Sequence, residues 1–339
     1  MAPPKGPAQG ARLRGGNNNR EDTMHIGFNA PTSGPLIEPD SLGRIITEGE
    51  ALGFDYATVS DHIMVPRNLA SKYPYTDTGE FPAGPEAAWL EQLATTAWLA
   101  ALTQKLRFVL SVMVVPYRPA VLTAKLLSTI DTLSKGRLTL GIGVGWCREE
   151  FEAVNAAPFD DRGAVTDEWI DVCKELWSAE YPKFSGKYVS FDDVVFTPKP
   201  VQQPIPIWVG GESAPALRRT VRYAQGWYPV GTNPQFPMNT LERFKAGLAR
   251  FRGFAEKGNR DPAEIAVALR VLSGPGLKPR GQIDGAAELF TGSDADWVGD
   301  IKALGELGVS AVDVRLTART LERTLDTMRR FRDGVLTKL

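Results

Sequence analysis

Cysteine and histidine are scarce in this chain, which has two of each among its 339 residues. Cys147 and Cys173 lie far apart, and neither they nor His25 and His62 stand at the spacing of a zinc site. An excess of charge of one sign is also lacking, because 39 Lys and Arg residues face 40 Asp and Glu residues. The sequence therefore argues against a Cys/His metal centre, and nothing in its charge points to nucleic acid or an anionic membrane.

Long apolar runs are absent too, since none approaches the roughly eighteen residues that a membrane helix needs. Residues 1–23 are rich in Gly, Pro, Asn and Arg and lack the apolar segment of a secretory signal, so we expect a disordered tail there. The composition, with 43% apolar and 23% charged residues, is typical of a globular protein. We expect a single domain over residues 24–339, located in the cytoplasm.

The segment 107–150 contains two predicted strands, a helix between them and a glycine-rich turn. Residues 107–115 form an apolar run without polar alternation, which is typical of a strand buried on both faces. Apolar residues recur at helical spacing over 119–133, and 137–142 is a second apolar strand. This pattern predicts a βαβ unit with parallel strands and a right-handed crossover.

The same alternation of strand and helix extends along the whole chain. We predict eight strands, each followed by a helix, at 25–30, 54–59, 107–115, 137–142, 205–209, 227–230, 265–272 and 311–316. Such an alternation favours an α/β fold of one (β/α)8 TIM barrel, with insertions in its βα loops, over an open sheet. Active sites of barrels lie where the strands end and the βα loops begin. The long polar loop 64–85 follows the second strand and is a candidate lid.

Asp61 and His62 come directly after that second strand. An imidazole titrates near neutral pH, so His62 is a candidate general acid or base, and Asp61 beside it would bias its charge. The alternative is a histidine that caps a loop or bonds a backbone carbonyl. His25, inside the first strand, is more simply explained as structural.

The fourth strand ends in Gly-x-Gly-x-Gly over 141–145, followed by Trp146. Three missing side chains let the backbone bend and let a flat or anionic ligand approach its amides, and the less favoured alternative is that the glycines only allow tight strand packing. The last spacing departs from the dinucleotide-binding fingerprint. Trp146, Trp208 and Trp227 are candidates to line a slot for a planar ring, the alternative being that they are core residues.

Three segments are candidate phosphate sites. Residues 210–213 (Gly-Gly-Glu-Ser) form a strand-to-helix turn that offers amides, a hydroxyl and a helix dipole. Residues 291–293 precede a late helix, and the loop with Lys278 and Arg280 lies nearer the usual phosphate position of barrels. Periodicity does not decide among the three.

The residues after Trp146 have simple structural explanations. Glu149 and Glu150 stand near a predicted helix start, where carboxylates suit the helix dipole. Cys147 lies at the same place, where a thiolate would be stabilised. No second histidine lies near it in sequence, so we do not predict a catalytic cysteine.

Five stretches, in order, resemble the bacterial luciferase-like flavin and deazaflavin oxidoreductases: VSDH at 59–62, SVMVVPYRPAVLTAK at 111–125, LSKGRLTLGIGVGW at 133–146, PIWVGGES at 206–213 and GWYPVG at 226–231. The chain looks most like the branch that depends on the deazaflavin coenzyme F420. The similarity covers nearly everything from Met24 onward. That family is a (β/α)8 barrel, which agrees with the strand count.

The resemblance implies roles for particular residues. The peptide between Ser111 and Val112, just before Met113, would match the family's bulge in the third strand, often a non-prolyl cis peptide that supports the cofactor ring from behind. Asp61 and His62 would lie near the ring, with His62 where a sugar-phosphate dehydrogenase of the family has its base.

The cofactor contacts that we predict, from the turns and the resemblance together, are Ser111, Val112, Met113, Gly143, Gly145, Trp146, Gly210, Gly211, Ser213, Val230 and Gly231. The resemblance places the cofactor phosphate on Gly210, Gly211 and Ser213. Trp146 stands where the sugar-phosphate dehydrogenase has a catalytic glutamate, so neither its acid–base pair nor its substrate is implied here.

The leading functional prediction is an oxidoreductase that moves a hydride between F420 and a small organic substrate. The alternatives are an FMN-dependent monooxygenase, to which a partner reductase delivers reduced flavin for O2 activation, and a non-catalytic flavin-binding barrel. A sugar-phosphate isomerase with phosphate near Lys278 and Arg280 is a further alternative, since fold does not fix chemistry. The resemblance also implies a homodimer.

Overall fold

The main sheet is a closed barrel of parallel strands. The computed structural model describes residues 24–83, 87–276 and 278–339, so the predicted tail lies outside the described residues. The nine strands of the sheet follow the order β3-β2-β1-β13-β10-β9-β8-β5-β4, and a further pairing of β3 with β5 closes the ring. They are β1 His25–Asn29, β2 Tyr56–Val59, β3 Arg107–Leu110, β4 Met113–Val114, β5 Leu138–Gly143, β8 Ile207–Gly210, β9 Gly226–Tyr228, β10 Ala266–Val271 and β13 Val309–Val314. β3 and β4 both pair with β5 and together form one strand position, so the nine strands make an eight-stranded barrel. The predicted (β/α)8 barrel is therefore confirmed.

The third strand of the barrel differs from the prediction of one continuous strand over 107–115. β3 ends at Leu110 and β4 begins at Met113, and the Ser111–Val112 peptide between them is cis, as the resemblance implied. The neighbouring strand presses closely on this break, since a Cβ on Gly141 would lie 2.0 Å from the carbonyl oxygen of Leu110. The prediction of an unbroken strand was therefore wrong.

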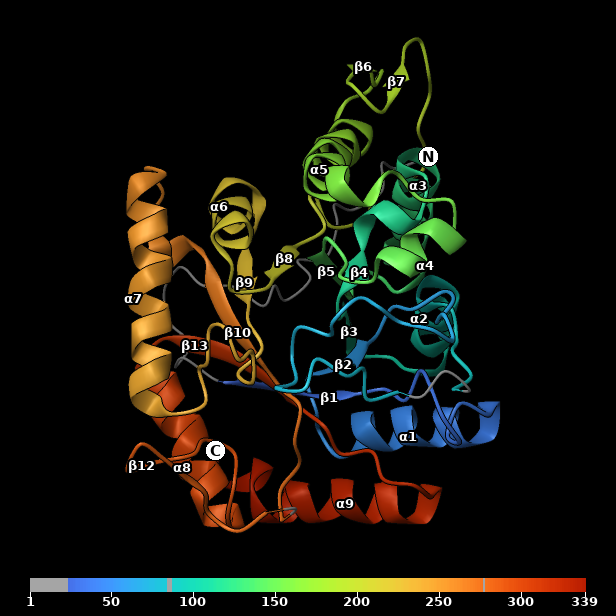
Figure 1. The fold of residues 1–339 in the computed structure, drawn as a ribbon. Coiled ribbons are helices and arrows are strands. Elements are labelled where there is room, and N and C mark those ends of the chain that lie inside the picture. The colour runs from blue at the N-terminus through green and yellow to red at the C-terminus, as the bar shows by residue number, and fades with distance from the viewer. Residues whose placement is uncertain (1–23, 84–86, 277) are drawn as a thin grey trace, which may run out of the picture.

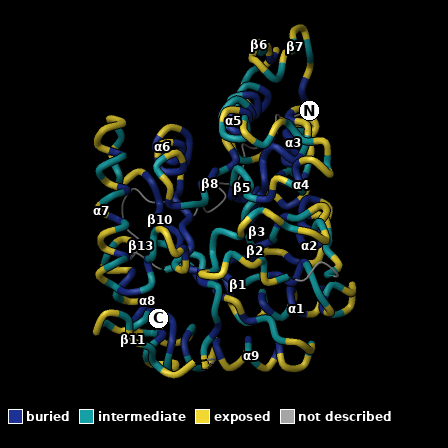
Figure 2. The backbone as a smooth tube through the Cα atoms, in the orientation of Figure 1, coloured by how far each residue is buried: buried dark blue, intermediate teal, exposed yellow. Residues whose placement is uncertain are grey.

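Helices surround the strands (Figure 1), and their buried sides face the barrel (Figure 2). Pro39 and Pro119 stand at helix starts, as the missing amide of proline favours. Helix α2 begins after Glu91, whose carboxylate accepts a hydrogen bond from the Ala94 amide. The helices are α1 Pro39–Ala51, α2 Gln92–Leu102, α3 Ala120–Leu133, α4 Arg148–Ala153, α5 Arg162–Ser178, α6 Ala214–Tyr223, α7 Leu241–Lys257, α8 Asp294–Glu306 and α9 Leu321–Gly334.

Small elements decorate the barrel. A hairpin of β6 Phe184–Ser185 and β7 Ser190–Phe191 projects beyond α5 in Figure 1. A second hairpin pairs β11 Gln282–Ile283 with β12 Ala286–Ala287. Four 3-10 helices complete the description: η1 Val115–Tyr117, η2 Phe159–Asp161, η3 Pro262–Glu264 and η4 Leu336–Lys338.

The core has a layer inside the barrel and another between barrel and helices. Neighbouring residues of a strand point to opposite faces, so Tyr228 lies inside with Trp208, while Trp227 lies outside. Trp227 stacks on Phe251 of α7 with ring centroids 5.0 Å apart. The predicted ring slot of three tryptophans was therefore wrong. No helix in the described part of the chain is long and apolar enough to cross a bilayer.

Candidate active site

His62 lies just beyond β2 at the carboxyl-terminal mouth of the barrel, and a carboxylate from another loop holds its ring. Oε2 of Glu150 is 2.9 Å from Nδ1 of His62. Glu150 belongs to the first turn of α4, just after the glycine-rich end of β5, so barrel closure brings the two side chains together. Among the described residues, the other ring nitrogen, Nε2, has no hydrogen-bond partner.

Glu150 is 1% exposed and accepts several hydrogen bonds. The Tyr117 hydroxyl donates to Oε2 at 2.9 Å, and the amides of Ile63 and Met64 donate to Oε1 at 2.8 and 3.1 Å. Burial opposes ionisation, but the bonds from His62 and the two amides outweigh it and hold the pKa of Glu150 below its ordinary value. Glu150 is therefore an anion that orients the ring of His62.

Asp61 contacts an arginine and an amide. Its Oδ1 and Oδ2 accept bonds from Arg118 at 2.7 and 2.9 Å, and Oδ2 also accepts the Val114 amide at 2.8 Å. Arg118 continues to Glu91 at the start of α2. The carboxylate on His62 is thus Glu150 rather than Asp61. We interpret Asp61 as a positioning residue, and its direct part in chemistry stays a prediction.

The candidate lid folds over the mouth and packs on His62. The ring of Phe81 lies 5.0 Å from that of His62 and 5.3 Å from that of Trp146. Tyr73 packs 5.2 Å from Trp146, and Trp89, just before α2, lies 4.6 Å from His62. Trp146 therefore lies beside His62, as expected of a residue at the mouth.

The lid also reaches the opposite side of the mouth. Burial raises the pKa of Tyr75, and the carboxylate of Glu212 raises it further while Arg270 lowers it. Glu212 follows β8 and Arg270 belongs to β10. The loop thus spans the mouth from His62 to the strands on which we placed the cofactor phosphate.

Glu149 fastens the lid to α4. Its Oε1 accepts the amides of Ala70 and Ser71 at 2.7 and 2.9 Å. Burial raises the pKa of Glu149, but the Ser71 hydroxyl and these backbone amides outweigh it and lower the pKa to about 2. Cys147 points its thiol at the same carboxylate, and burial raises the pKa of Cys147 to about 12. The interpretation of Glu149 and Glu150 as mere partners of a helix dipole was incomplete, because both join α4 to the β2–α2 loop.

Two glycines, Gly143 and Gly210, pack closely against the side chain of Val112. A Cβ on Gly143 would lie 2.7 Å from Cγ2 of Val112, and one on Gly210 would lie 3.1 Å from its Cγ1. Gly145 has a φ of +85° and packs on Phe151. Tight strand packing, the structural alternative, therefore explains these glycines. It also fixes Val112 between β5 and β8, as a support for a flat ring requires, while the direct cofactor contacts of Gly143, Gly145 and Met113 stay predictions.

The turn at 210–213 keeps features that suit an anion. Gly211 has a φ of +98°, which a side chain rarely adopts, and its carbonyl accepts the Trp227 indole N–H at 2.9 Å. Ser213 is exposed at the N-cap of α6, where its hydroxyl accepts the Ala216 amide at 3.4 Å. The positive end of the helix dipole and the exposed Ser213 hydroxyl both lie on the solvent side of this turn, so that side suits an anion.

Glu212, in the middle of that turn, is directed inward. It is 2% exposed, and its carboxylate accepts the Val230 amide and the Asn233 side chain, each at 2.6 Å. Burial raises the pKa of Glu212. The Gly231 amide donates to the carbonyl of Arg270. The amides of Val230 and Gly231 are thus already bonded, and cofactor contacts of these two residues stay predictions that must use other atoms.

In the other two candidate phosphate sites, aspartate side chains of the same chain already bind the candidate residues. Both terminal nitrogens of Arg280 bind Asp300 at 2.7 Å. Ser293 forms a capping box with Asp296 at the start of α8. The charge of Arg280 and the hydroxyl of Ser293 are thus compensated within the chain, which favours residues 210–213 among the three candidates.

Polar side chains form a floor below the mouth. Ser111 Oγ is 2.8 Å from the Tyr228 hydroxyl, which donates to Asp313 at 2.5 Å. Arg270 donates to Ser111 and, at 3.4 Å, to Thr58. Burial raises the pKa of Asp313 to about 6, against the opposing effect of Arg270. These residues, here called the polar floor, adjoin Val112 on the barrel side.

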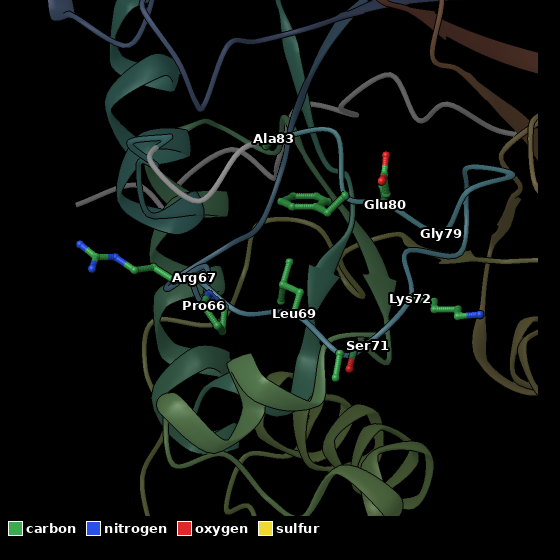
Figure 3. Close-up of a pocket in the computed structure, with 10 residues that line it drawn as sticks. Pro66, Arg67, Leu69, Ser71, Lys72, Gly79, Glu80 and Ala83 are labelled. Atoms are coloured by element: carbon green, nitrogen blue, oxygen red, sulfur yellow. The ribbon is translucent and has the colours of Figure 1, made fainter.

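A cavity of about 470 Å³ lies within the lid. Figure 3 shows Leu69 pointing into the space that the loop encloses, while the charged ends of Arg67 and Lys72 point away from it. Phe81 lines this cavity and touches His62, so one side chain separates the two. A second cavity, of about 200 Å³, lies beside Glu212 and Arg250.

Sequence reasoning missed Glu150, Arg270 and Asp313 as parts of the mouth. Arg270 and Asp313 had a signal, because a charged residue inside an otherwise apolar strand is seldom buried without a role. Glu150 had none beyond its place near Trp146, since its partner is 88 positions away.

Comparisons with known proteins agree with the fold. The family model described as luciferase-like monooxygenase matches residues 22–273. An uncharacterised protein of Mycobacterium tuberculosis is 38% identical over 220 residues, which are 64% of this chain and 73% of that protein.

Solved structures resemble the barrel at low identity. An F420-dependent secondary alcohol dehydrogenase in complex with an F420–acetone adduct has a TM-score of 0.70 and 16% identity, covering 93% of this chain and 99% of that one. A riboflavin lyase with modified FMN and riboflavin has a TM-score of 0.70 and 15% identity, covering 93% and 90%. At these identities the likeness shows the fold alone.

Proposed function

Because the chain belongs to the luciferase-like monooxygenase family, whose members use F420 or FMN, we propose that it transfers a hydride between F420 and a small organic substrate. The observation that carries this proposal is the pair of His62 and Glu150 at the same barrel mouth as Val112, whose position Gly143 and Gly210 fix. An acid–base group and a rigid ring support then face one mouth, which is what coupled hydride and proton transfer requires.

The residues at the mouth fit a flat cofactor with a phosphate. Val112 is the backing for the ring, since Gly143 and Gly210 fix its position. Ser213 and the start of α6 are the support for the phosphate. The bound cofactor supplies the hydride chemistry, and the protein supplies orientation and proton transfer.

His62 would accept the proton that the substrate hydroxyl releases. When a substrate alcohol loses hydride from its carbon, the hydroxyl proton must pass to a base, and Nε2 of His62 is the ring nitrogen left for that task. The ionised Glu150 then stabilises the protonated imidazole, as a carboxylate does for a catalytic histidine elsewhere. The lid would shield this step from water.

Cofactor identity is the decisive test. The purified protein is titrated with F420 and, separately, with FMN, and ligand fluorescence gives the two affinities. We expect F420 to bind at least tenfold more tightly than FMN. The family description favours a second candidate, an FMN-dependent monooxygenase served by a reductase. Tight FMN binding with negligible F420 binding would establish that candidate instead.

Substitutions test the placement of the site. We expect His62→Ala to lower kcat by about 10²–10⁴-fold, the usual worth of a general acid or base, with cofactor affinity unchanged within about threefold. Gly211→Val should chiefly weaken cofactor binding, because φ at this position is +98°. Equal, small effects of both would show that the mouth is wrongly placed. Absence of turnover with every donor and acceptor, despite tight binding, would indicate a non-catalytic flavin-binding barrel.

A further inference from the structure

Arg270 holds an unusual place for an arginine. It is the fifth residue of β10, and it lies two positions after Ala268, which packs inside the barrel. Side chains two apart in a strand share a face, so Arg270 points inward, at the last level before the mouth. Only 17% of its side chain is exposed.

The guanidinium is only partly compensated. Its Nη1 donates to the hydroxyls of Ser111 and Thr58, and the Tyr228 oxygen is a further hydrogen-bond partner. Asp313 is the only carboxylate within 4 Å among the described residues, and it stands 3.5 Å away without a direct hydrogen bond. That carboxylate instead accepts the Tyr228 hydroxyl at 2.5 Å. A guanidinium has five N–H donors, so Arg270 keeps donors for a further acceptor.

The remaining N–H donors of Arg270 lie next to Val112, the residue that we propose as the support for the cofactor ring. Arg270 bonds to Ser111, the residue directly before Val112, and its backbone bridges to Val230. Tyr73 and Tyr75 of the lid lie close to Arg270. Burial raises the pKa of both tyrosines, and the positive charge of Arg270 opposes this rise. The guanidinium therefore sits under the lid, beside the support for the ring.

We propose that Arg270 binds the cofactor ring and stabilises the negative charge that the ring gains on reduction, a proposal that rests on the function proposed above. Hydride transfer moves two electrons and one proton from the substrate carbon to the ring, while the hydroxyl proton goes to His62. The ring thus gains one unit of negative charge. A cation in a low-dielectric site favours the reduced ring over the oxidised one.

A purely structural role for Arg270 would be to hold Asp313. Removing only the arginine leaves a buried carboxylate alone, which destabilises the fold for reasons unrelated to the ring. The informative variant is therefore Arg270→Met with Asp313→Asn, which removes both charges. Arg243→Met is the control, because this residue lies on α7 and pairs with Asp284.

The experiment measures dissociation constants for the oxidised and the reduced form of whichever of F420 and FMN the wild type binds. In Arg270→Met/Asp313→Asn, we expect the reduced form to lose at least tenfold more affinity than the oxidised form. For a two-electron couple, tenfold corresponds to a bound-cofactor potential lower by about 30 mV. Arg243→Met should keep the wild-type ratio.

Equal losses for both forms would overturn the role of Arg270 and leave the proposed function standing. Failure of the wild type to bind either cofactor would overturn both. Asp313→Asn alone gives an independent measurement that does not depend on the folding of the double variant. It leaves the arginine uncompensated, so preference for the reduced form should rise several-fold, and an unchanged or smaller preference would contradict the proposal.

Discussion

Glu150 and His62 are joined by a 2.9 Å contact between a carboxylate oxygen and Nδ1, across 88 positions of sequence. Since the same carboxylate holds the amides of Ile63 and Met64, it sets the path of the chain as well as the orientation of the imidazole. The bonds join the βα loops that follow β2 and β5, which flank the third strand of the barrel, β3 and β4. Acid–base chemistry at His62 therefore depends on a residue that need not touch substrate.

Glu150→Gln tests this dependence. The amide keeps the size of the side chain but loses the negative charge that would stabilise the imidazolium formed on proton transfer, so we expect kcat to fall by about 10–100-fold. Cofactor affinity should stay within about threefold. Glu152→Gln, on the exposed side of the same helix, is the control. Steady-state kinetics across pH distinguish the two outcomes, because a purely structural effect would lower activity without changing the shape of the pH profile.

Much of the fold could be predicted because its signals are local. Buried parallel strands give continuous apolar runs, and helices give 3.6-residue periodicity, so the βα alternation could be counted. The break at Ser111 and Val112 could not be counted this way, because both sides of it are equally apolar. It reached the prediction only through the resemblance.

The site was predicted less completely than the fold. His62, Trp146 and the 210–213 turn lie at the ends of strands, where barrel topology predicts them. The partner of His62 was assigned to the adjacent Asp61, whereas that carboxylate binds Arg118 and the Val114 amide. Sequence adjacency is a poor guide at a strand end, because successive side chains diverge there and the partner of His62 comes from the loop after β5, on the far side of the third strand.

Gly143→Ala tests the grip on Val112. The added methyl would lie 2.7 Å from Cγ2 of Val112, so we expect a loss of about 1–3 kcal/mol in the free energy of unfolding, as overpacking usually costs. Gly253→Ala in α7 is the control, because nothing lies within 4 Å of its Cβ and alanine stabilises a helix by about 0.5–1 kcal/mol. Urea unfolding measures both. Equal stabilities of the two variants would contradict the packing argument.

Glu149→Gln tests the fastening of the lid. The variant replaces a charged acceptor of the Ala70 and Ser71 amides, and charged acceptors make the stronger bonds. We expect trypsin to cleave after Arg67 and Lys72 several-fold faster than in the wild type, with Glu152→Gln as control. Bound cofactor should slow the cleavage. Unchanged digestion would show that the aromatic contacts alone hold the loop.

Asp313 predicts a pH dependence of stability. Burial raises its folded-state pKa from 3.8 to about 6, so the unfolded chain releases this proton at lower pH than the folded one does. Stability from this group is therefore greatest below pH 4 and is lost as pH rises to about 6, by roughly 3 kcal/mol in all. Asp313→Asn should remove that slope. Chemical unfolding of both proteins between pH 4 and 7 checks it, and parallel curves would contradict the prediction.

The exposed apolar side chains of α3 lead to a prediction about assembly. Leu122 and Leu133 are 56% and 67% exposed, and Leu126 lies one turn after Leu122 on the same face. Large exposed apolar patches mark interaction surfaces, and a symmetric dimer would cover this one with its own copy. We propose that the protein is a homodimer through α3. Light scattering of the wild type should give twice the monomer mass, and Leu122→Glu with Leu126→Glu should halve it, whereas Val195→Glu, at an exposed site after β7, should not. A wild type that is monomeric at high protein concentration would contradict this assembly.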